Sequence, residues 1–139
     1  MNVYEKRIAD EINQIANKEI FFNAYEIMRE PDGLATEIIG KLVSWACKPT
    51  NTTPITIARE CLKQFPTDWI SNKIKQTVLS SVDIDDYWEY RRLLELSEII
   101  SIDLLEWVIT LGEGAKDLDI IEAVDDFNEI LQSLKKQNI

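Results

Sequence analysis

Histidine is absent from this 139-residue sequence, and glycine and proline occur only four times each. Because histidine is the commonest catalytic base and a frequent metal ligand, its absence excludes Ser-His-Asp and Cys-His mechanisms and argues against a metal site. The shortage of turn-forming residues argues against β-sandwiches and barrels. Since 45% of the residues are apolar, the chain is too hydrophobic to be disordered, and we expect an ordered, mostly helical protein.

Long hydrophobic runs and closely spaced cysteine pairs are also missing. No stretch is long and apolar enough for a membrane span, and residues 1–17 lack the apolar core and cleavage site of a secretory signal. Cys47 and Cys61 stand alone, so we expect two buried thiols in a reducing compartment, with a disulfide or redox pair as the alternative. The length fits one domain, residues 1–139, and the expected location is the cytoplasm.

Apolar residues recur at helical spacing along the whole chain and predict an all-α fold of six or seven short antiparallel helices. The predicted helices cover residues 1–30 with a kink or break near Asn17, 34–47, 55–64, 67–81, 87–99, 102–111 and 119–136. Capping chemistry supports these boundaries. The expected N-caps are Thr53, Thr67, Asp85 or Asp86, Ser101, and Asp117 or Asp119, and Gly112 is expected to end a helix as a C-terminal glycine.

The last two predicted helices differ in how much of their surface is apolar. Residues 102–111 leave only Asp103, Glu106 and Thr110 for solvent, so this helix should lie between neighbours. The final helix instead has one apolar stripe, formed by Ile120, Val124, Phe127, Leu131 and Leu134. A single stripe is typical of a helix that ends a stack.

Four tryptophans, Trp45, Trp69, Trp88 and Trp107, lie 24, 19 and 19 residues apart in different predicted helices, which suggests helical pairs of about forty residues. Residues 117–127 (DLDIIEAVDDF) resemble the second helix of a HEAT-type repeat, which opens with an acidic cap and packs aliphatic and alanine positions on the preceding helix. The resemblance covers residues 34–136 and departs from the family at Ile121, where an arginine is common. It implies a curved stack used for binding, and a compact irregular bundle is the alternative.

Catalytic motifs are not found. The acidic run at residues 83–86 lacks the glycine and glutamate of a calcium loop, so we interpret it as a helix N-terminus. No phosphate-binding loop, nucleophile elbow or dinucleotide fingerprint occurs. We therefore expect no enzyme activity and no catalytic, cofactor-binding or metal-binding residues, with a paired-carboxylate enzyme as the remaining alternative.

Acidic residues outnumber basic ones by 25 to 15, which gives a net charge of −10. Residues 1–82 hold ten of each sign, whereas residues 83–139 hold fifteen acidic and five basic residues, so the imbalance lies entirely in the second half. Such a field repels nucleic acid and membranes and attracts basic proteins. The final helix concentrates acidic residues opposite its apolar stripe: Asp119, Glu122, Asp125, Asp126 and Glu129.

Trp88 and Arg92 share a face of the predicted helix 87–99, opposite Tyr90 and Leu93. Tryptophan and arginine often anchor protein interfaces. The simpler interpretation, which we favour from the sequence, is that Trp88 and Ile99 pack against the next helix while Arg92 pairs with Glu95 or Glu89.

These patterns favour a non-catalytic module that binds a basic protein through its acidic C-terminal surface. Its most concrete form is an immunity protein or inhibitor that covers the nucleic-acid-binding cleft of a toxic nuclease. The alternative is a helical-repeat scaffold or adaptor that holds a peptide or helix through apolar contacts around Trp88. No cofactor, nucleic acid or membrane is expected as a partner.

Overall fold

The computed structural model describes residues 2–137, and within them it contains eight helices and no strand. The helices are α1 (Val3–Ala16), α2 (Ala24–Met28), α3 (Asp32–Cys47), α4 (Thr52–Leu62), α5 (Thr67–Ser81), α6 (Tyr87–Ile100), α7 (Ile102–Gly112) and α8 (Leu118–Gln137). The predicted all-α class is confirmed. The count exceeds the predicted six or seven because the first segment divides: Asn17 adopts a left-handed conformation with φ of 55° and ends α1, and α2 forms separately. None of the helices in residues 2–137 has both the length and the apolar character needed to cross a membrane.

Three of the predicted N-caps are confirmed, and two are wrong. The side chains of Asp86 and Ser101 accept the backbone N–H groups of Glu89 and Leu104, both at 3.0 Å, and the carboxylate of Asp117 accepts that of Asp119. Asn51, rather than Thr53, is the N-cap of α4, because its amide oxygen accepts the Thr53 N–H at 2.9 Å. Pro66 stands at the N-cap of α5 without any side-chain bond, so Thr67 is the first helical residue instead of the cap.

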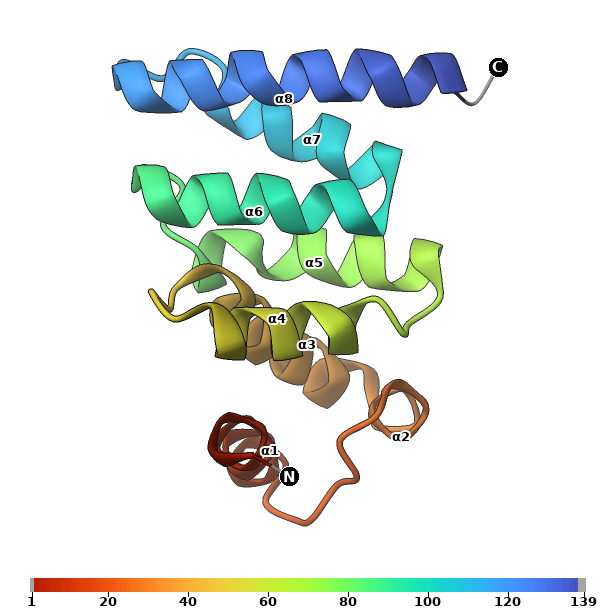
Figure 1. Ribbon diagram of the computed structural model, residues 1–139. Coiled ribbons are helices and arrows are strands. Elements are labelled where there is room, and N and C mark those ends of the chain that lie inside the picture. The colour runs from red at the N-terminus through yellow and green to blue at the C-terminus, as the bar shows by residue number, and fades with distance from the viewer. Residues whose placement is uncertain (1, 138–139) are drawn as a thin grey trace.

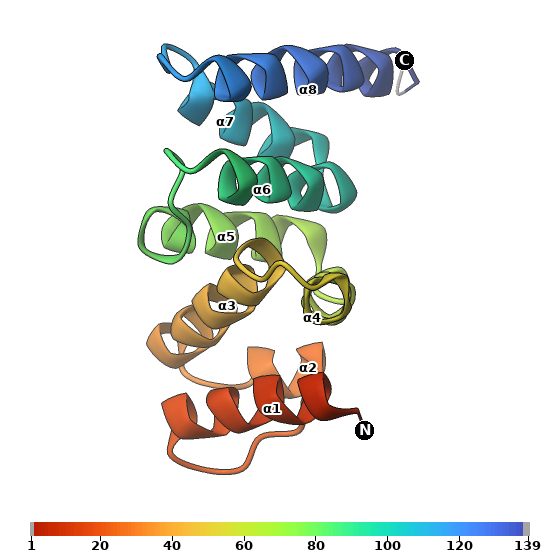
Figure 2. The same cartoon turned by 60° about the vertical axis from the view of Figure 1, so that its left-hand side comes forward.

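The helices stack one above another from α1 at one end to α8 at the other (Figures 1 and 2). α3 is the most connected helix, since it packs against α1, α2, α4, α5 and α6. Farther along, α7 packs against α6 and α8, and α6 also contacts α8. One connected set of buried apolar side chains extends from Ile8 in α1 to Leu131 in α8.

The predicted difference between the last two helices is confirmed. α7 buries Leu104, Leu105, Val108 and Ile109 and exposes Asp103, Glu106 and Thr110. α8 covers α7 with a single stripe that buries Ile120, Val124, Phe127 and Leu131, and Leu134 is half-buried. The opposite face of α8 is therefore left to solvent at the end of the stack.

Gly112 has a different role from the expected C-terminal glycine. It is the last residue of α7, and the only glycine with positive φ among the described residues is Gly114. A Cβ atom on Gly112 would lie 2.6 Å from the Tyr90 ring and 2.7 Å from a Val124 methyl group. Tyr90 is fully buried and donates its hydroxyl to the Val108 carbonyl at 2.9 Å. Gly112 therefore provides the space in which α6, α7 and α8 meet.

Cys47 and Cys61 are buried free thiols, as predicted. Burial raises the thiol pKa of each residue to about 12, because the thiolate would lose its hydration inside the core.

Substituting Gly112 with alanine tests the close approach of α6, α7 and α8. We expect Gly112→Ala to lower the free energy of unfolding by about 1–3 kcal/mol, because the added methyl group overlaps Tyr90 and Val124. Gly33→Ala is the matched control, since no atom lies within 4 Å of the added Cβ. It should raise stability by up to about 1 kcal/mol through helix propensity. Equal effects of the two substitutions in urea titrations would contradict this role.

The buried thiols predict a loss of stability at alkaline pH. The pKa of each thiol is raised in the folded state, so the two neutral thiols contribute fully to the stability of the fold below the unfolded thiol pKa of about 8.5. This contribution to stability is lost as pH rises toward about 12. Above a pH of about 8.5, the free energy of unfolding should therefore decrease by about 1.4 kcal/mol per pH unit for each thiol. Urea titrations at pH 8 and pH 10 should show a larger decrease for the wild type than for Cys47→Ala/Cys61→Ala. The same decrease in both proteins would show that the thiols do not contribute.

Candidate functional site

The outer face of α8 carries most of the carboxylates predicted to bind a partner. The Asp117 carboxylate begins the helix by accepting the N–H groups of Asp119 at 2.8 Å and Ile120 at 3.3 Å. From that start, the buried stripe fixes the rotation of the helix. With 3.6 residues per turn, Glu122, Asp125 and Glu129 then fall on the side opposite the stripe, and all three are exposed.

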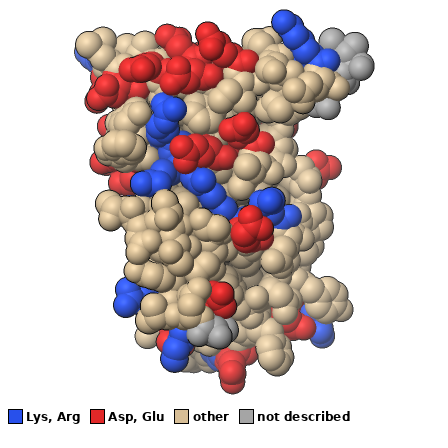
Figure 3. All heavy atoms as spheres, in the orientation of Figure 1, with Lys and Arg blue, Asp and Glu red and all other residues tan. Residues whose placement is uncertain are grey.

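Acidic side chains are concentrated on the surface over α8 (Figure 3). Figure 3 shows the acidic side chains along the first part of α8 at the top of the molecule, whereas basic residues occupy its last turn. None of Glu122, Asp125 and Glu129 forms an ion pair with another described residue. Asp119 is also exposed, next to the N-terminus of α8, where a negative charge is favourable. We call Asp119, Glu122, Asp125 and Glu129 the α8 acidic face.

Asp126 is the predicted carboxylate that the structure does not place on this face. It is half-buried beside α6, where it accepts from the Arg91 guanidinium at 3.3 Å. Partial burial lowers the pKa of Arg91, but the hydrogen bonds and charge interactions with Asp126 and Tyr87 together more than offset this and leave the pKa raised. Asp126 therefore joins α8 to α6 instead of offering a free charge to a partner.

Two apolar residues lie beside the acidic face and were not among the predicted site residues. Leu118 is 79% exposed and Ile121 is 39% exposed. The sequence could have indicated their exposure, since neither residue falls on the apolar stripe that faces the core. Exposed aliphatic groups next to unpaired carboxylates give a surface that can combine apolar contact with charge complementarity.

The predicted packing of Trp88 and Ile99 against the next helix is wrong. Trp88 is 64% exposed and Ile99 is 42% exposed. α7 packs instead on the opposite face of α6, where the Tyr90 hydroxyl reaches Val108. Trp88 has one aromatic neighbour, Tyr87, whose ring meets it edge-on with the centroids 5.0 Å apart.

Arg92 does not form the predicted ion pair with Glu95 or Glu89. Glu95 accepts from Arg59 at 2.7 Å, and Glu89 accepts the backbone N–H of Asp83 at 3.0 Å. Both candidate partners therefore have other donors, and Arg92 forms no ion pair within residues 2–137.

Trp88 and Arg92 line a surface cavity of about 320 Å³. Lys48, Pro49 and Thr50, from the loop between α3 and α4, form its other wall, and Asp86 and Glu89 complete it. α8 does not contribute to this cavity. The predicted site residues therefore form two separate surfaces, and Arg91 and Asp126 link the helices that carry them.

Within the described residues, no group of three or more histidine, cysteine or carboxylate side chains could hold a metal ion. The chain matches no protein-family model, and neither curated proteins nor solved structures include one significantly similar to it. The chemistry of the two surfaces is therefore the basis for a functional proposal.

Proposed function

We propose that this protein is a non-catalytic binding module whose α8 acidic face engages a basic protein. The observation that carries the proposal is the set of exposed carboxylates on α8 that have no ion-pair partner within residues 2–137, next to Leu118 and Ile121. Fifteen lysine and arginine side chains were available to neutralise them, yet nine of these pair elsewhere. An unpaired charge at the surface leaves its full field available to a partner.

The spacing of the carboxylates supports a nuclease as the partner, with this chain as its immunity protein or inhibitor. At 1.5 Å rise per residue, Glu122, Asp125 and Glu129 are about 4.5 and 6 Å apart along the helix axis. A nuclease cleft is lined with basic side chains that contact successive phosphates. A rigid row of negative charges can occupy such a cleft and block nucleic acid, and complementary fields speed its association.

A short HEAT-like stack over residues 34–136 is part of the same proposal. It is supported by the contacts of α3 with α5, of α5 with α7 and of α6 with α8, since alternate helices touch in a stack of helical pairs. In this arrangement α8 is the terminal helix, whose outer face is free for a partner.

Neutralising the α8 acidic face should abolish binding of the basic partner. The test variant is Glu122→Gln/Asp125→Asn/Glu129→Gln, which removes three unpaired charges without shortening a side chain. Glu19→Gln/Glu60→Gln/Asp68→Asn is the control, because it changes the net charge equally at exposed positions in the first half. Immobilised wild type and control should capture a basic protein from lysate of the source cells at low salt, and the test variant should bind it at least about tenfold more weakly.

Salt dependence and nuclease assays sharpen this test. Affinity for the captured protein should fall as salt rises from 50 to 500 mM, since screening weakens exposed charge pairs. If the partner is a nuclease, the wild type should inhibit it and the test variant should not. The neutralised residues form no ion pair with any described residue, so urea titrations should show unchanged or slightly higher stability. Capture of acidic proteins, or equal loss with the control variant, would contradict the proposal.

The exposure of Trp88 supports the second function, a scaffold that binds a peptide or helix in the cavity beside Arg92. Trp88→Ala distinguishes the two functions, with Tyr25→Ala as a control because Tyr25 is 69% exposed on α2. A scaffold that uses Trp88 should lose about 2 kcal/mol of binding energy at any salt concentration. Binding through α8 should not change. Titrations of the captured partner at 50 and 500 mM salt make this comparison.

A further inference from the structure

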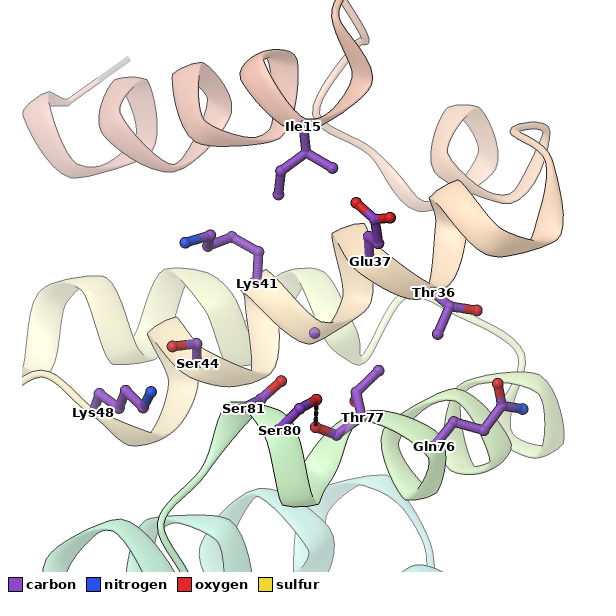
Figure 4. Close-up of a pocket in the computed structure, with 11 residues that line it drawn as sticks. Ile15, Thr36, Glu37, Lys41, Ser44, Lys48, Gln76, Thr77, Ser80 and Ser81 are labelled. Carbon is purple, nitrogen blue, oxygen red and sulfur yellow. Dashed lines mark hydrogen bonds between the residues drawn. The ribbon is translucent and has the colours of Figure 1, made fainter.

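A cavity of about 460 Å³ lies between α3 and α5, far from the α8 acidic face, and polar side chains form most of its wall (Figure 4). Its size falls within the usual range of small-molecule sites, about 300–1,000 Å³. α3 and α5 approach closely beside it because α3 has Gly40, where an added Cβ would lie 3.1 Å from the Ser81 hydroxyl. The lining residues used below are Glu37, Lys41, Ser44, Lys48, Gln76 and Ser81.

Two lysines at one end of the cavity have no acidic partner. Within the described residues, the basic side chains without an ion pair are Arg7, Lys41, Lys48, Arg92, Lys116 and Lys136. Lys41 and Lys48 both line this cavity, and Lys48 also borders the cavity that contains Trp88 and Arg92. Three of the six unpaired basic residues, Lys41, Lys48 and Arg92, therefore line two cavities that share Lys48.

Two hydroxyl groups at the same end have no partner. Ser81 is only 9% exposed, yet its hydroxyl makes no hydrogen bond to any described residue, and Figure 4 shows it pointing from α5 toward α3. Ser44 likewise has no hydrogen-bond partner within residues 2–137 and lies on the same side of the cavity as the two lysines (Figure 4). By contrast, the Ser80 hydroxyl is committed to the Thr77 carbonyl at 3.0 Å. The Ser44 and Ser81 hydroxyls therefore both line the cavity without a protein partner, which leaves them free to donate to a ligand there.

We propose that this cavity binds a small phosphorylated molecule of the sugar-phosphate class. The two ammonium groups and the hydroxyls of Ser44 and Ser81 offer four donor groups to a phosphate. Lysine is a common phosphate ligand, and charge-assisted hydrogen bonds are the strongest of these contacts. At the other end, Gln76 and the Glu37 carboxylate accept hydrogen bonds from the hydroxyl groups of the sugar.

Titration calorimetry and NMR with glucose 6-phosphate, glucose and inorganic phosphate test this site. Glucose 6-phosphate should bind at least about tenfold more tightly than inorganic phosphate, and glucose should not bind detectably. The amide signals of Gly40, Ser44 and Ser81 should shift during the titration, which places the ligand in the cavity even if a variant misfolds. Absence of binding by glucose 6-phosphate, or shifts confined to other residues, would overturn the proposal.

Variants distinguish binding of the phosphate in the cavity from non-specific attraction to any lysine on the surface. Lys41→Gln and Lys48→Gln should each weaken binding by about tenfold, the loss of one charge-assisted contact. Ser81→Ala should weaken it by a smaller factor. Lys116→Gln is the matched control, because Lys116 is an exposed, unpaired lysine outside the cavity. An equal loss with Lys116→Gln, or no loss with Lys41→Gln, would show that the cavity does not hold the phosphate.

Discussion

The packing of α3 against its neighbours is the constraint on which the rest of the structure depends. α3 contacts five other helices and buries seven side chains, Ala35, Ile38, Ile39, Leu42, Val43, Ala46 and Cys47. Each large apolar side chain removed from water contributes about 1.5–3 kcal/mol, so this helix holds both the α1–α2 end and the α5–α8 stack. Gly40 permits its close approach to α5, and the same approach brings Ser81 to the edge of the polar cavity. The packing of α3 on α5 and the candidate binding site therefore both depend on this close approach at Gly40.

The acidic face of α8 follows from where the stack ends. An interior helix such as α7 must bury most of its circumference, which restricts its exposed polar residues to three positions, only two of them charged. α8 covers only one side of the stack, so half of its surface can hold carboxylates without cost to the core. Asp126 lies at the edge of this solvent-facing side of α8, close enough to α6 to pair with Arg91. Asp125, one residue earlier, faces solvent and pairs with no described residue.

Local signals in the sequence predicted the second half of the fold well, because they act within a few residues. Asp86 and Ser101 cap helices by bonds to the next turn, and the single stripe of α8 fixes its outer face. The errors in this half came from contacts distant in sequence. Gly112 is required by Tyr90 and Val124, and the predicted partner of Arg92, Glu95, is taken by Arg59. The α3–α5 cavity brings together residues about forty positions apart, which helical periodicity does not reveal.

The two candidate sites have opposite charge, yet they can work in one small protein because of the distance between them. α6 lies between α3 and α8 and contacts both, so the two are separated by two helix packings of about 8–10 Å each. The Debye length at physiological salt is about 8 Å, and the carboxylates of α8 are therefore largely screened at Lys41 and Lys48. Moreover, the lysines belong to the half of the chain with no net charge. Segregating the acidic residues thus allows an anion-binding cavity in a protein of net charge −10, which an even distribution of the same residues would oppose.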